Sequence, residues 1–64
     1  ESLAAYQEVL ELNPNDADAY LGMGITYWNM DERQMARSSW EKSMAVQPDN
    51  NESRGWLILF RQES

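Results

Sequence analysis

Two prolines that lie 34 residues apart, Pro14 and Pro48, each end a similar stretch of sequence. Each stretch opens on an aromatic residue, Tyr6 or Trp40, and apolar residues follow four and six positions later. This spacing is typical of a helix, and proline cannot continue one, so each stretch predicts a helix that runs into a turn. Because the two phrases recur at one fixed period, the chain is expected to be a tandem helical array.

The remaining sequence predicts further helices and shows no strand-like alternation. Helices are expected over about residues 2–12, 17–29 and 32–46, with a fourth that Asp49-Asn50-Asn51 is expected to cap. Asn15-Asp16 supplies cap candidates for the second helix, and Asp31 with Gln34 forms a capping-box pattern before the third. The predicted fold class is therefore all-α, with four helices in one domain over residues 1–64.

Composition excludes several kinds of site and partner. The formal charge of −6 repels phosphate backbones, so neither nucleic acid nor an anionic membrane surface is an expected partner. The chain has no cysteine and no histidine, which removes disulfides, thiol nucleophiles, zinc sites of the usual kind and histidine bases. Its longest apolar run, residues 56–60, is far too short for membrane insertion. We expect no metal site and no cofactor.

Residues 17–50 resemble one complete tetratricopeptide repeat, a helix–turn–helix unit of 34 residues. The positions that carry the resemblance are Tyr20, Met23, Gly24, Tyr27, Ala36, Trp40 and Pro48. Asp31 stands where the family usually has glycine, and Ser43 stands where it usually has alanine. The small residues Gly24 and Ala36 are expected to let the two helices approach closely.

The resemblance also implies roles for the flanking segments. Residues 1–14 match the second helix of a preceding repeat, and residues 51–64 match the first helix of a following repeat or a terminal capping helix. In that last segment Ile58 replaces the glycine and Arg61 replaces the tyrosine. The chain also lacks a starting methionine, so we expect a fragment or a processed chain, and its compartment stays open with the cytoplasm slightly favoured.

In this family the first helix of each repeat lines a concave groove that binds partners. The corresponding partner-binding positions are Asp18, Leu21, Ile25, Trp28 and Asn29. The alternative interpretation is that the apolar members pack on a neighbouring helix, since large exposed apolar patches are unusual on a monomer. The basic clamp with which some relatives hold a peptide carboxylate is absent, so a hydrophobic or amphipathic segment is the expected ligand.

The apolar run in the last helix suggests a second mode of association. Trp56, Leu57 and Phe60 could pair with another copy of the chain, because arrays of this type need about three repeats and polar ends. The alternative is that the last helix folds back and closes the chain's own core.

The expected function is that of a protein–protein interaction module, with a protein or peptide partner and no enzymatic activity. The rival hypothesis is a structural unit that forms homo-oligomers through its open helical ends. The paired carboxylates, such as Asp16 with Asp18, stand at predicted helix starts, where capping accounts for them without catalysis.

Overall fold

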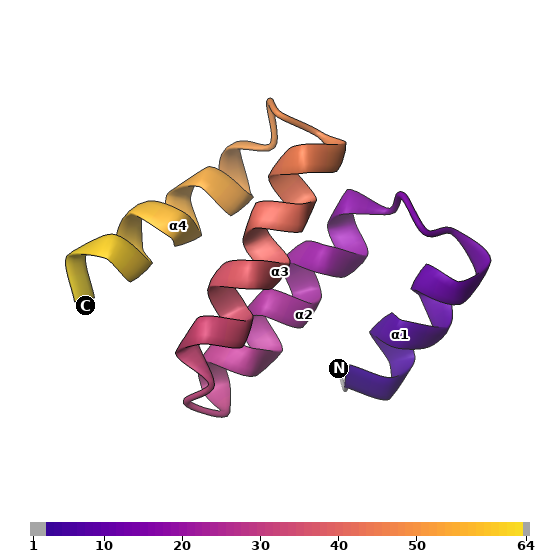
Figure 1. Ribbon diagram of the computed structural model, residues 1–64, viewed down its shortest axis with the longest axis horizontal. Helices are drawn as coiled ribbons and strands as arrows, with labels where there is room; N and C mark the ends of the chain where they lie inside the picture. Colours follow the sequence, from indigo (N-terminus) through magenta and orange to yellow (C-terminus); the bar gives the residue numbers. More distant parts are fainter. Residues whose placement is uncertain (1–2, 64) are drawn as a thin grey trace.

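The computed structural model describes residues 3–63, which form four helices and no strand. The helices are α1 (Leu3–Leu12), α2 (Ala17–Asn29), α3 (Arg33–Val46) and α4 (Asn51–Glu63). Each packs against the next along the chain, so α1 and α4 are the outermost helices (Figure 1). The all-α prediction is confirmed. Within the described residues, no helix combines the length and apolar character needed to cross a membrane.

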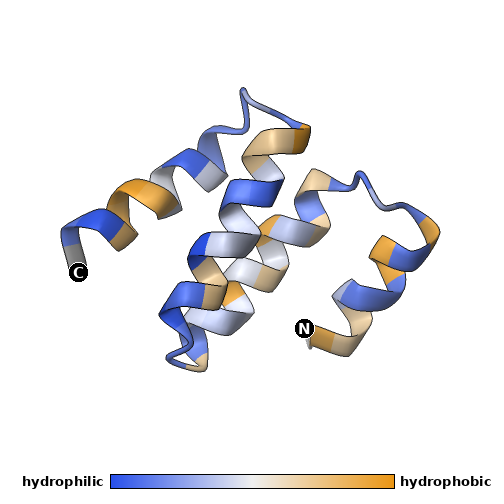
Figure 2. Ribbon diagram, viewed as in Figure 1, coloured by the Kyte–Doolittle hydropathy of each residue, from blue (hydrophilic) through white to orange (hydrophobic). Residues whose placement is uncertain are grey.

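Short polar turns separate the helices, and hydrophilic residues dominate these turns (Figure 2). Asp16 caps α2, because its side-chain oxygen accepts a hydrogen bond from the backbone N–H of Ala19 at 3.2 Å. Asn50 does the same for α4 through the N–H of Ser53, at 3.1 Å. Both side chains were among the predicted caps, and they fix where these two helices begin.

The predicted capping box at Asp31 and Gln34 is wrong. Asp31 adopts a positive φ of 64°, and the helix begins only at Arg33, with no side-chain hydrogen bond from the preceding Glu32. The N–H groups of Asp31 and Glu32 instead donate to the carbonyls of Trp28 and Tyr27, at 3.0 and 2.8 Å, and close the end of α2. Aspartate tolerates this left-handed conformation, which explains how it stands where the family usually has glycine.

The core lies where α2, α3 and α4 meet, and it is mainly aromatic. Leu21, Ala36, Trp40 and Phe60 form its buried cluster, and Trp40 is completely inaccessible. The Trp40 ring stacks on that of Trp56 with centroids 5.2 Å apart, and its indole N–H donates to the carbonyl oxygen of Leu21 at 3.3 Å. A single side chain on α3 thus contacts both neighbouring helices.

Two glycines of α2 allow the flanking helices to approach. A Cβ atom at Gly24 would overlap the Trp40 ring on α3, and one at Gly22 would overlap the Tyr6 ring on α1. The predicted close approach at Gly24 is therefore present. The role of Gly22, which seats the preceding helix, was not predicted.

A buried polar network joins α2, α3 and α4 near the second proline turn. The Ser43 hydroxyl donates to the carbonyl oxygen of Ala17 at 2.9 Å and accepts from the Ser53 hydroxyl at 2.8 Å. The side-chain amide of Asn50 also donates to Ser43, at 3.4 Å. Both serines are fully buried, so these bonds set how α4 lies on the α2–α3 pair.

Candidate functional site

The predicted groove positions share one face of α2 but differ in exposure. Asp18 and Asn29 are exposed at its two ends, whereas Leu21 is buried with 8% of its surface accessible. Ile25 and Trp28 are half-buried against the core. We call these five residues the α2 face. Its open part consists of two polar ends and the accessible surfaces of Ile25 and Trp28.

Trp28 is held from several sides. Its ring centroid lies 5.8 Å from that of Trp40, and 6.4 Å from those of both Trp56 and Phe60. The guanidinium of Arg33 stands over the same ring, 4.5 Å from its centroid. Trp28 therefore packs on α4, as the alternative interpretation of the α2 face expected, while part of its surface remains accessible.

The three residues proposed for self-association lie on the side of α4 that packs inward. Phe60 is buried, with 8% of its surface accessible, and Trp56 and Leu57 are half-buried against the core. The most exposed large apolar residue of this helix is Ile58, at 44%. In this chain α4 folds back onto the α2–α3 pair, and self-association through these residues stays a prediction.

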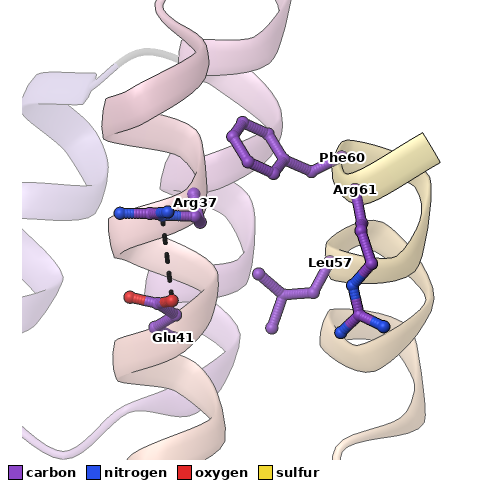
Figure 3. Close-up of a pocket in the computed structure, with 5 residues that line it drawn as sticks. All are labelled: Arg37, Glu41, Leu57, Phe60 and Arg61. Atoms are coloured by element: carbon purple, nitrogen blue, oxygen red, sulfur yellow. Dashed lines mark ion pairs between the residues drawn. The ribbon is translucent and has the colours of Figure 1, made fainter. Parts of the chain in front are cut away.

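A pocket of about 380 Å³ opens between α3 and α4 (Figure 3). Leu57 and Phe60 of α4 point toward α3 and form its apolar part. Its charged part comprises Arg61 on α4 and the Arg37–Glu41 ion pair on α3, in which the Arg37 Nε and Glu41 Oε2 atoms lie 3.8 Å apart. The pocket is thus amphipathic, with charges of both signs.

A second, shallower pocket of about 270 Å³ lies on α4 alone. The residues that line it are Asn51, Glu52, Gly55, Trp56 and Leu59. Sequence reasoning missed this pocket, although the period of 34 contained the signal. Adding 34 to the numbers of Asp18, Leu21 and Ile25 gives Glu52, Gly55 and Leu59. Three of the five residues that line the pocket therefore stand on α4 at positions equivalent to members of the α2 face.

Neither pocket is equipped for metal chemistry. Within residues 3–63, acidic side chains nowhere gather in the groups of three or more that could hold a metal ion. Among the described carboxylates at helix starts, Asp16 caps α2 through the backbone N–H of Ala19, whereas Glu32 makes no side-chain hydrogen bond to α3. Each of the two pockets combines apolar residues with charged ones, a composition that suits recognition of another molecule.

Comparison with known proteins identifies the family. A family model described as "TPR repeat" matches residues 1–31, a range that takes in α1 and α2. The match covers 31 of the 64 residues and supports assignment of the chain to the tetratricopeptide repeat family. Members of this family are in general non-catalytic modules for protein–protein interaction, and the chain has the helical repeat architecture of such modules.

The chain is also similar to a stretch of a yeast protein. The RNA polymerase-associated protein CTR9 of Saccharomyces cerevisiae is 32% identical over 64 residues, an alignment that covers 95% of this chain. The chain spans only 6% of the length of that relative, so the comparison concerns one short stretch of a long protein. No solved structure matches the chain.

Proposed function

We propose that this tetratricopeptide chain binds a hydrophobic or amphipathic segment of a partner protein against the α2 face. The observation that carries the proposal is the accessible surface that Ile25 and Trp28 retain between two exposed polar residues, Asp18 and Asn29. Apolar area bounded by polar groups is the usual composition of a protein-binding surface. Leu21 lies beneath this surface and would support it without contacting the ligand.

The contacts of Trp28 make this surface rigid. Three aromatic neighbours and the Arg33 guanidinium fix the ring, so little side-chain freedom would be lost when a ligand covers it. Preorganised aromatic residues of this kind contribute strongly to binding because the entropy cost of ordering them is already met in the free protein.

Ile25 is the residue with which to test the proposal. Short random peptides displayed on phage would be selected on the intact chain, and the best peptide measured by fluorescence polarisation. Ile25→Gln removes apolar area from the α2 face and should weaken that peptide by about tenfold, since burying half an isoleucine contributes about 1 kcal/mol or slightly more. Trp28→Ala is less suitable, because it would remove a ring that packs against three other aromatic rings. Ile25 also touches the core, so thermal unfolding must show that Ile25→Gln remains folded.

The matched control is Val9→Gln, which makes the same kind of change on an exposed apolar residue of α1. The peptide should bind this variant as tightly as it binds the parent chain. Equal losses for the two variants, or a library from which no peptide is enriched, would contradict binding at the α2 face.

A second candidate function is self-assembly, and the outer helices provide the observation in its favour. Leu12 on α1 is 90% exposed and Ile58 on α4 is 44% exposed, and these helices form the two ends of the row (Figure 1). If copies associate end to end, light scattering will show a molar mass that rises with concentration, and Ile58→Glu will abolish the rise. A monomer mass at every concentration would remove this candidate.

A further inference from the structure

We propose that the pocket on α4 lined by Glu52, Gly55, Trp56 and Leu59 seats an aliphatic side chain of the partner segment, with a lysine or arginine beside it. This inference rests on the proposed function, because the pocket meets the α2 face at the contact between Trp56 and Trp28 and would bind the same segment. It adds the chemistry of the partner, which is basic and aliphatic.

The repeat places the pocket next to the α2 face. Glu52, Gly55 and Leu59 stand 34 residues after Asp18, Leu21 and Ile25, so they occupy equivalent positions on successive first helices. The two surfaces meet where Trp28 of the α2 face approaches Trp56 of the pocket, with ring centroids 6.4 Å apart. One extended segment could therefore contact both.

Gly55 is the glycine whose presence the packing within the chain does not explain. Apart from proline, glycine is the least favourable residue in a helix interior. At Gly22 and Gly24 the packing of neighbouring helices offsets that cost, because the rings of Tyr6 and Trp40 occupy the space that a larger side chain would need. At Gly55 a Cβ atom would meet nothing within 4 Å in the described part of the chain, so no internal group uses the space. An incoming side chain would lie directly on the helix backbone there.

The walls of the pocket are apolar and fixed. Trp56 stacks on Trp40 at a centroid distance of 5.2 Å and an interplanar angle of 17°, which holds its ring in one orientation. Leu59 is half-buried and lines the pocket three residues further along α4. An aliphatic side chain that enters between them would lose water on both sides without disturbing the core.

The charge beside the pocket favours a cation. Glu52 is exposed, and no lysine or arginine is present among the pocket-lining residues. On the α2 face Asp18 is exposed at one end, and the Arg33 guanidinium stands over Trp28 at the other. The pocket between α3 and α4 differs, because Arg37 and Arg61 line it. A basic segment is therefore favoured at the α4 pocket, whose charged lining residue is Glu52, over the pocket that Arg37 and Arg61 line.

The phage-displayed random peptides supply the probe, and the variants decide the site. The enriched peptides should carry lysine or arginine next to leucine, isoleucine or valine. Gly55→Gln fills the pocket with a side chain and should weaken binding of the best peptide at least tenfold. The same variant should raise the melting temperature of the chain by several degrees, because glutamine favours a helix more than glycine does. Loss of binding then cannot be ascribed to unfolding.

The charge is tested by Glu52→Lys, with Glu8→Lys on α1 as the matched control, since both variants change the net charge equally. Only Glu52→Lys should weaken the peptide by tenfold or more. Equal losses for the two variants would show a general charge effect and overturn the site. Enrichment of acidic or uncharged peptides would overturn the proposed chemistry.

The two proposals fail in different ways. If Ile25→Gln weakens the peptide while Gly55→Gln and Glu52→Lys leave it unchanged, the α2 face binds the segment and the α4 pocket does not. If the pocket variants weaken it and Ile25→Gln does not, the α4 pocket stands without the α2 face. If no peptide is enriched, both proposals are contradicted.

Discussion

At the scale of single residues, the packing of the helices depends on glycines, which leave space for neighbouring rings, and on buried polar side chains. Gly24 provides the space that the Trp40 ring fills, and Ser43 carries three hydrogen bonds inside the core. The first role was predictable, because the family pattern has glycine at this position beside an aromatic residue. The second was not, since Ser43 and Ser53 have the composition of ordinary surface residues and only the packing of three helices buries them.

The glycines provide a direct test, because alanine should have opposite effects at two of them. Gly24→Ala should destabilise the chain by about 1–3 kcal/mol, since the added methyl group overlaps the Trp40 ring and the core must shift. Gly55→Ala should stabilise it by up to about 1 kcal/mol, since alanine is the better helix former and the space there is open. Thermal unfolding followed by circular dichroism measures both, and a stabilising Gly24→Ala would contradict the packing described here.

The buried serines allow a second test by a double-mutant cycle. Ser43→Ala leaves the Ala17 carbonyl and the Ser53 hydroxyl without their shared partner, which should cost about 1–3 kcal/mol. Replacing both serines by alanine should cost less than the sum of the two single changes, because one unsatisfied hydroxyl disappears. Chemical denaturation gives the energies, with Ser38→Ala as the control. Additive costs would show that the hydroxyl–hydroxyl bond contributes nothing.

At the scale of elements, helix positions could be predicted more reliably than helix contacts. The caps at Asp16 and Asn50 and the proline turns are local signals, so the four helices were foreseen. The turn at Asp31 was misread because a capping-box pattern and a left-handed turn use the same residue type. The exposure of the α2 face could not be read from the sequence, because it depends on the angle at which α4 docks.

Docking of α4 on the aromatic cluster is itself testable. Phe60→Ala removes a buried ring that contacts Trp28, and it should cost about 3–5 kcal/mol if the site cannot collapse. The near-UV circular dichroism of the packed tryptophans should fall together with stability. Ile58→Ala, on the exposed side of the same helix, should change stability by no more than about 0.5 kcal/mol. Equal effects of the two variants would mean that α4 does not pack as described.

At the scale of the whole molecule, acidic and basic residues are distributed unevenly, and this distribution bears on both folding and partner binding. Residues 1–32 contain seven acidic residues and no basic residue, whereas all five basic residues lie in residues 33–64. Three of these cations stand over aromatic rings: Arg33 over Trp28, Arg37 over Phe60 and Lys42 over Tyr20. The α4 pocket has no cation among its lining residues, which leaves the partner to supply one there.

Binding of a basic peptide should therefore depend on salt. Raising the ionic strength from about 0.05 M to about 0.5 M shortens the screening length severalfold. The chain's affinity for the peptide should therefore fall severalfold. Titrations by fluorescence polarisation at the two ionic strengths measure the change. The peptide's affinity for the Glu52→Lys variant should respond much less, since the exposed charge at the pocket has been reversed. The same salt dependence for the variant would place the electrostatic attraction elsewhere on the chain.

The measurement that tests the account most directly is an NMR titration of the isotope-labelled chain with the best selected peptide. If the segment lies across the α2 face and the α4 pocket, the largest shifts will fall on the Gly55 amide and on the indole N–H groups of Trp28 and Trp56. Resonances of Arg37 and Arg61, in the other pocket, should move little. Shifts centred on Arg37 and Arg61, with those of Gly55 and Trp28 unmoved, would contradict the account.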